Sequence, residues 1–294
     1  MQIVDTALAA APARAADFVE LTKPRITFLV LVTTAVGYAL GVGANFHPAV
    51  FVSLLVGTAL VSGGASALNQ WAERDADARM VRTASRPLPT GRLAPVDALL
   101  FGLAISTVGL VLLASAVNLL TALLALGSLS SYVLAYTPLK RVTSLCTLVG
   151  AVPGAIPPMM GWAAARGSLG REALALFGIL FLWQLPHFLS IAWIYRDDYA
   201  RGGFPMLPVT DPGGASTARQ SVAYAAALVP VTLLAGALTA AGERYLWGAV
   251  ALGALFVGCT IAFAFARSVR TARWVFLVSV LYLPAVLGLM VLDR

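Results

Sequence analysis

Long apolar stretches separated by short polar segments dominate this chain. Nine of the stretches have about the 18–25 residues that an α-helix needs to cross the hydrocarbon core of a membrane. We therefore predict nine transmembrane helices. They cover approximately residues 26–43, 48–70, 94–114, 117–136, 143–165, 171–194, 218–240, 245–266 and 273–292.

The composition supports the same interpretation. Hydrophobic residues make up 60% of the chain, charged residues 11%, and the mean hydropathy is +0.86, values typical of an integral membrane protein. The predicted fold is an all-α integral membrane protein whose nine helices form a single bundle. An N-terminal arm (residues 1–25), with a short interfacial helix at residues 7–19, precedes a polytopic membrane domain (residues 26–294).

The net charge of +7 is explained by topology. With the N-terminus in the cytoplasm, 16 of the 20 Lys and Arg residues fall on the cytoplasmic side and 4 on the other, as the positive-inside rule requires. Nucleic-acid binding is therefore not needed to explain the basic excess. Both cysteines lie inside predicted spans, which excludes a disulfide framework.

The densest polar stretch, NQWAERDADARMVRTASRPLPTGR, runs from Asn69 to Arg92 at the end of the second span. If the helix continues past the apolar segment, Asn69, Glu73 and Asp77 share one face because they are four residues apart. Asp75 then points roughly the opposite way. One amide and two carboxylates in a row suit Mg²⁺, and the arginines that follow, Arg82 and Arg86 among them, suit phosphate oxygens. The alternative is a positive-inside loop whose carboxylates merely balance its arginines.

A second polar stretch runs from Trp183 to Pro208. Gln184 and His187 lie in the middle of the sixth span, where polar side chains are costly and usually functional. His187 could form an interhelical hydrogen bond, ligate a porphyrin metal, or act as a base near an acceptor. Asp197 and Asp198 follow at the cytoplasmic end of the span.

Three shorter segments add cations, aromatic rings and helix breakers. Arg25, in the sequence Lys-Pro-Arg, and the pair Lys140 and Arg141 are either anchors at the membrane surface or phosphate contacts. Tyr132 and Tyr136 precede Lys140 and Arg141 in the sequence. The fifth span contains three prolines and three glycines, which indicates a kinked helix or a ligand cavity.

The two acidic clusters each end an even-numbered span, and both are followed by a basic residue and a proline-containing turn. This weak internal repeat predicts a bundle in which the two acidic ends face each other. Two carboxylate clusters, several arginines and a membrane cavity indicate Mg²⁺-assisted chemistry on a lipid diphosphate.

The stretch that begins at Asn69 resembles the first acidic motif of the UbiA-type intramembrane prenyltransferases. More narrowly, it resembles their haem-farnesylating branch, the protohaem IX farnesyltransferases (haem O synthases). Further matches are LTKPR, YTPLKR, GAVPGAIPPMMGW, LPHF and DDYARGGFPMLP, in the expected order over about residues 20–292. Three positions depart from the quinone-type members: Gln70 replaces an Asp, and Tyr195 and Tyr199 replace an Asp pair. How a second metal would be held is therefore open.

The resemblance implies a multi-pass protein of the bacterial inner membrane, with its N-terminus in the cytoplasm and a central cavity that opens near the cytoplasmic face. It implies that farnesyl diphosphate alkylates a vinyl group of protohaem IX (haem b), with addition of water, to give haem O for haem–copper terminal oxidases. Mg²⁺ is the implied cofactor. Membrane lipid and a haem A synthase or oxidase-assembly protein are the implied partners.

The resemblance also assigns roles to individual residues. The implied catalytic residues are Asn69, Glu73, Asp77, Asp197 and Asp198, with the metal held by Asn69, Glu73, Asp77 and Asp198. The implied substrate-binding residues are Arg25, Arg82, Arg86, Lys140, Arg141, Tyr132, Tyr136, Gln184 and His187. Two other functions fit parts of the sequence: a UbiA-type prenyltransferase acting on an aromatic quinone precursor, and a transporter with broken helices.

Overall fold

The structure, a computed structural model, describes residues 14–43 and 45–294. Within these residues nine helical segments are long and apolar enough to cross a membrane, as the apolar stretches predict. Seven of the nine crossings are single helices: α2 (Pro24–Val42), α3 (Pro48–Asp77), α4 (Pro95–Ala116), α9 (Arg171–Ile194), α12 (Ala215–Leu238), α13 (Glu243–Ala266) and α14 (Val269–Leu292).

Two crossings are interrupted. The fourth consists of α5 (Leu119–Ser130), a π-helical segment η1 (Ser131–Tyr136) and α6 (Thr137–Leu139). The fifth consists of α7 (Cys146–Ala155) and α8 (Pro157–Arg166), separated at Ile156. Pro157 lacks an N–H and favours the first turn of a helix, so it starts α8.

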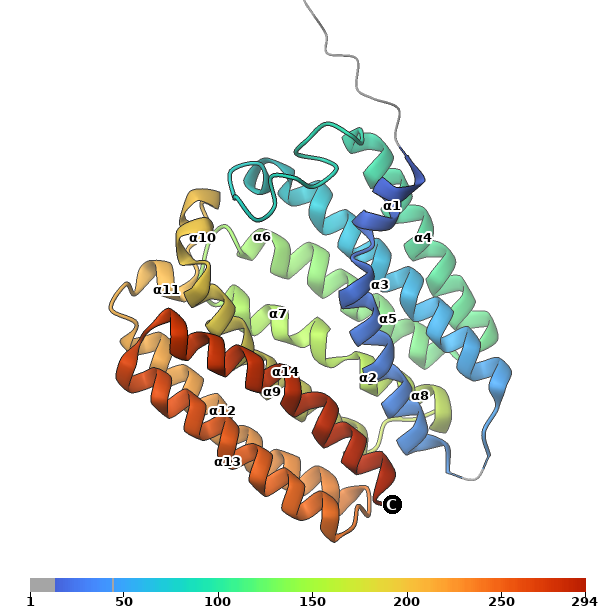
Figure 1. Cartoon of the computed structure of the whole chain (residues 1–294). Coiled ribbons are helices and arrows are strands. Elements are labelled where there is room, and N and C mark those ends of the chain that lie inside the picture. Colours follow the sequence, from blue (N-terminus) through green and yellow to red (C-terminus); the bar gives the residue numbers. More distant parts are fainter. Residues whose placement is uncertain (1–13, 44) are drawn as a thin grey trace, which may run out of the picture.

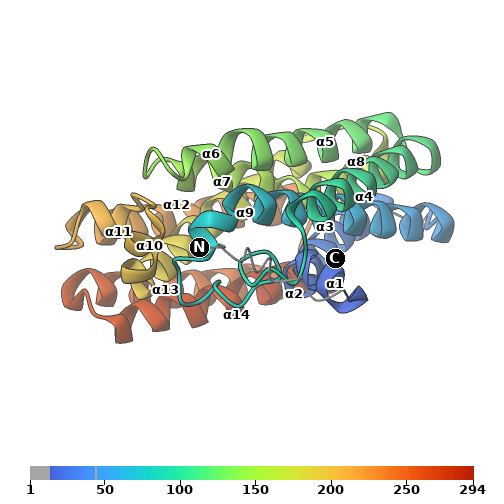
Figure 2. The ribbon, with the colours of Figure 1, turned by 90° about the horizontal axis from the view of Figure 1, so that it is seen from above.

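Three short helices complete the described chain: α1 (Ala15–Leu21), α10 (Arg196–Gly202) and α11 (Leu207–Thr210). Helix α1 overlaps the interfacial helix predicted at residues 7–19, but residues 7–13 lie outside the described part of the chain. Figure 1 shows α1, α6, α10 and the loop between α3 and α4 at the same end of the bundle. Viewed from above, that loop crosses in front of the bundle between α10 and α4 (Figure 2).

The helices are apolar nearly all around because their outer faces meet lipid. Large hydrophobic side chains such as Val111 and Phe265 are exposed on the surface, as expected for helices that face hydrocarbon. Helix α14 contacts α2 and α9, and α9 contacts α7. These contacts join the N-terminal and C-terminal helices into one bundle around the region where the polar side chains are buried.

Small residues allow α2 and α8 to pack closely, as is usual between helices in lipid. A methyl group added at Gly161 would overlap the backbone carbonyl of Thr34, and one added at Gly37 would overlap that of Pro158. Because the obstacles are backbone atoms, neither can move aside without shifting a whole helix.

We therefore predict that Gly161→Ala destabilises the bundle by about 1–3 kcal/mol, the usual cost of overpacking. Thermal unfolding of the detergent-solubilised protein measures the effect. Gly127→Ala is the matched control, because Gly127 is also inside a helix but has no atom near the added methyl group. Equal unfolding midpoints for the two variants would contradict the prediction.

Candidate active site

Three oxygen-bearing side chains line one face of the last turns of α3. The helix runs to Asp77, seven residues beyond the apolar stretch, so that Asn69, Glu73 and Asp77 lie one above another. Each is no more than 2% exposed. Asp75 points away, as predicted from its spacing: its side chain is 73% exposed and lies 3.7 Å from the Arg74 guanidinium.

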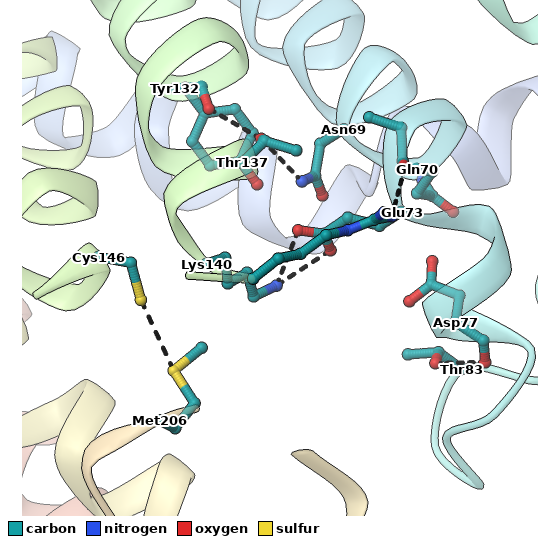
Figure 3. A network of polar contacts seen from close by, with 12 residues as sticks. Asn69, Gln70, Glu73, Asp77, Thr83, Tyr132, Thr137, Lys140, Cys146 and Met206 are labelled. Carbon is teal, nitrogen blue, oxygen red and sulfur yellow. Dashed lines mark hydrogen bonds and ion pairs between the residues drawn. The ribbon is translucent and has the colours of Figure 1, made fainter. Parts of the chain in front are cut away.

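Basic groups from three other segments meet this row. The Lys140 ammonium donates to both oxygens of Glu73 at 3.1 and 3.0 Å. The Arg86 guanidinium donates to Asp77 Oδ2 at 2.6 Å, and Lys23 Nζ donates to Asn69 Oδ1 at 3.2 Å. Figure 3 shows Lys140 and Glu73 facing each other, with Asp77 a turn further along α3. The burial of two carboxylates is thus balanced by cations, as buried charge requires.

The surroundings shift the pKa of the two lysines in opposite directions. For Lys23, burial together with the nearby Arg86 charge lowers the pKa to about 7. For Lys140, burial acts to lower the pKa, but the adjacent Glu73 carboxylate outweighs it and raises the pKa above its ordinary value. Lys140 is therefore held as a cation by its partner.

The row on α3 fits a divalent cation. Asp77 Oδ1 is buried and has no hydrogen-bond partner among the residues that the structure describes, and amide and carboxylate oxygens are ligands that Mg²⁺ accepts. Within the described residues, no three His, Cys, Asp or Glu side chains come together closely enough to hold a metal by themselves. Mg²⁺ is commonly held by one or two carboxylates together with water and substrate phosphates.

A cavity of about 280 Å³ lies between the helices, and its lining on α3 reaches Ser66, three residues before Asn69. Its walls come from α2, α3, α5, η1, α7, α8 and α9 and include Val30, Ala65, Tyr132, Tyr136, Gly154, Gln184 and Phe188. The π-helical turn, a feature frequent at functional sites, stacks the rings of Tyr132 and Tyr136 with their centroids 5.4 Å apart. The next residue, Thr137, accepts a hydrogen bond from Asn69 Nδ2 at 3.2 Å, which ties the cavity wall to the row.

Gln184 and His187, the two polar residues singled out in the middle of α9, have different surroundings. Gln184 lines the cavity and donates to the carbonyl of Ala151 at 2.7 Å. His187 is not among the residues that line it. Its Nδ1 lies 2.8 Å from Ser279 Oγ, and its ring stacks between Trp183 and Phe276. The interhelical hydrogen bond considered for His187 is therefore present, and it joins α9 to α14.

The second acidic cluster has other partners. Asp197 is exposed and lies 3.8 Å from Arg196. Asp198 is 6% exposed and accepts hydrogen bonds from the backbone N–H groups of Val81 and Arg82 at 3.0 and 3.3 Å. It also pairs with Arg201. The loop that follows α3 therefore contacts α10 through the backbone groups of Val81 and Arg82.

Arg82 and Arg141, both predicted to bind substrate, have different surroundings. The guanidinium carbon of Arg82 lies 5.5 Å from the centroid of the Tyr195 ring and 6.0 Å from that of Tyr199. Arg141 is exposed and donates to the carbonyl of Ala72 at 2.8 Å.

Lys23, and not Arg25, supplies the cation of the Lys-Pro-Arg segment. Arg25 is exposed, and in the described part of the chain no hydrogen bond or ion pair joins it to the row on α3. Lys23 is the residue before α2 and has a φ of 48°, a left-handed conformation unusual for lysine. The sequence shows two cations around a proline, but it does not show which one this backbone turn directs inward.

Comparison with known proteins agrees with this geometry. The sequence pattern of the UbiA prenyltransferase family matches residues 30–288. A protoheme IX farnesyltransferase of Solibacter usitatus (strain Ellin6076) is 50% identical over 95% of this chain and 98% of its own length. A protein of the same name from Koribacter versatilis (strain Ellin345) is 46% identical over 95% of this chain and 93% of its own length.

Solved structures show the same fold. A digeranylgeranylglyceryl phosphate synthase aligns with a TM-score of 0.80 at 16% identity, covering 95% of this chain and 97% of its own. A UbiA homolog from Archaeoglobus fulgidus bound to DMAPP and Mg²⁺ aligns with a TM-score of 0.65 at 17% identity, covering 93% and 99%. From the family pattern and the close relatives together, the chain belongs to the UbiA prenyltransferase family.

Proposed function

We propose that this membrane prenyltransferase transfers the farnesyl group of farnesyl diphosphate to a vinyl group of protohaem IX, with addition of water, to give haem O. The observation that carries the proposal is the buried row of Asn69, Glu73 and Asp77, which basic groups surround. Asn69 bonds to Thr137, the residue after Tyr136, which lines an apolar cavity. Such a site suits an amphiphile with a diphosphate head and an isoprenoid tail. The acceptor is assigned from the relatives named protoheme IX farnesyltransferase, which are 50 and 46% identical to this chain.

In this proposal Asn69, Glu73 and Asp77 hold Mg²⁺. When bound there, the metal would neutralise charge on the departing diphosphate. Lys23, Arg86 and Lys140, which now pair with the row, would donate hydrogen bonds to the other diphosphate oxygens.

The farnesyl tail would lie in the cavity, with C1 near its polar end. The stacked rings of Tyr132 and Tyr136 lie along the cavity wall, and their faces can stabilise an allylic cation. The C1–O bond breaks with its electron pair on the diphosphate, and the vinyl β-carbon attacks C1. Water then adds to the carbon beside the ring and releases a proton, so that no protein nucleophile is required.

The setting of the reaction is also proposed. The excess of Lys and Arg on one side favours a bacterial inner-membrane protein whose N-terminus and acidic clusters face the cytoplasm. The product would serve haem–copper terminal oxidases. A haem A synthase or an oxidase-assembly protein is the expected recipient, because a haem with a farnesyl tail is poorly soluble in water.

An acceptor assay tests the proposal. Purified protein with farnesyl diphosphate and Mg²⁺ should convert haem b into a product whose mass corresponds to a farnesyl group plus water. It should give none from 4-hydroxybenzoate. The reverse result would assign the chain to the quinone-precursor prenyltransferases.

Asp77→Ala should lower turnover by about 100-fold or more, the loss expected when a group that stabilises transition-state charge is removed. Glu73→Ala and Asp198→Ala should also lose turnover. Asp75→Ala is the matched control, because this carboxylate leaves the same helix end on the opposite, exposed face. Its turnover should stay within about twofold of the original. Normal turnover by well-expressed Asp77→Ala would refute the assigned role.

Lys23→Met should raise the Kd for farnesyl diphosphate about tenfold, the effect of losing one charge-assisted hydrogen bond. Arg25→Met should have a smaller effect, because its side chain points away from the row. Equilibrium binding of the radiolabelled donor measures both. A larger rise in Kd for Arg25→Met than for Lys23→Met would mean that the segment directs Arg25, and not Lys23, toward the row when substrate binds.

A further inference from the structure

The carboxylate of Asp198 is already fully engaged by the protein. Its Oδ1 accepts from the Val81 N–H at 3.0 Å and pairs with Arg201, and its Oδ2 accepts from the Arg82 N–H at 3.3 Å. Two of these donors are backbone groups of a loop more than 110 residues away in sequence. A carboxylate with these partners holds the loop in place, because the two backbone N–H groups would lose their hydrogen-bond acceptor if the Asp198 side chain turned away.

Two further contacts fasten the same loop to α10. Arg79 donates to the carbonyl of Gly202 at 3.1 Å. Met80 is 2% exposed and packs so closely on Gly202 that a methyl group there would meet its sulfur at 2.9 Å. Residues 79–82 are therefore held against α10 along their whole length.

These contacts with α10 fix the backbone of Arg82, and two tyrosine rings orient its guanidinium group. Its guanidinium lies over the rings of Tyr195 and Tyr199, which flank Asp198 on the same segment. No ion pair with a carboxylate involves Arg82 within the described residues. Its charge is thus oriented by aromatic faces but not neutralised.

The arginine is connected to the row on α3 by a continuous set of contacts. Tyr199 packs edge-on against Phe204, with ring centroids 6.3 Å apart. The Phe204 ring lies 4.7 Å from the ammonium of Lys140, which pairs with Glu73. These contacts connect Arg82, on the loop after α3, with the row through residues of α10, Phe204 and Lys140.

We propose that Asp198 is a positioning residue that fixes the Arg82 segment. The Arg82 guanidinium, and not a second Mg²⁺ held by Asp197 and Asp198, then supplies the positive charge on the α10 side of the diphosphate. This inference rests on the proposed function only in taking a prenyl diphosphate as the ligand. It follows that one divalent cation binds per chain, on the α3 side.

Counting bound metal tests the inference directly. The full-length protein in lipid nanodiscs is titrated with Mn²⁺ in the presence of farnesyl thiolodiphosphate, an analogue that resists ionisation, and bound Mn²⁺ is counted by electron paramagnetic resonance. We expect one Mn²⁺ per chain. Two Mn²⁺ per chain would overturn the proposal.

Amide exchange tests the anchoring role. In Asp198→Ala, hydrogen–deuterium exchange at the Val81 and Arg82 amides should accelerate by about tenfold or more, because both lose their acceptor. The control is Asp197→Ala, a neighbouring carboxylate that is exposed and accepts no bond from this loop. Its exchange at the two amides should match that of the original protein. Unchanged exchange in a folded Asp198→Ala variant would overturn the anchoring role.

Arg82→Gln removes the guanidinium charge but keeps the backbone N–H that donates to Asp198. This variant therefore tests the charge separately from the attachment of the loop. It should retain one Mn²⁺ per chain and bind the analogue about tenfold more weakly. Loss of the Mn²⁺ in Asp198→Asn, or undiminished analogue affinity in Arg82→Gln, would overturn the proposal. All these readouts are independent of the acceptor, so failure to farnesylate haem would reject the proposed function without affecting this inference.

Discussion

The burial of two carboxylates at the end of α3 is the constraint on which the polar end of this protein depends. Glu73 and Asp77 are almost completely removed from solvent, and a buried charge is tolerated only with a close, well-oriented partner. Lys140 from the end of the fourth crossing and Arg86 from the following loop are those partners. The end of α3, the loop that follows it and the end of α6 thus have to meet at one place.

Much of this arrangement follows from the sequence. The apolar stretches predict all nine crossings, because burying apolar side chains in lipid and satisfying the backbone within a helix leave few alternatives. The four-residue spacing of Asn69, Glu73 and Asp77 predicts the row, and α3 does continue far enough to form it. The opposite direction of Asp75 follows from the same periodicity.

The remaining features depend on contacts that no local pattern reports. His187 is oriented by Ser279 and Phe276 of a helix that begins about eighty residues later. Asp198 is bound by backbone N–H groups, which every sequence contains, so its partners cannot be recognised from residue types. The choice between Lys23 and Arg25 depends on one backbone angle in front of α2. The π-helical turn that stacks Tyr132 on Tyr136 has no comparable sequence signal.

The ion pairs on α3 have a consequence for selectivity. A phosphate compound alone would draw Lys140 and Arg86 away and leave two carboxylates stranded in a medium of low polarity. A divalent cation alone would strand the two basic groups in the same way. The magnesium salt of a diphosphate carries both signs of charge. Its cation can replace the basic partners of the carboxylates while its anion replaces the carboxylate partners of the basic groups, so no buried charge is left without a partner. In the proposed function, the end of α3 would therefore bind the magnesium salt of a diphosphate more readily than either of its components.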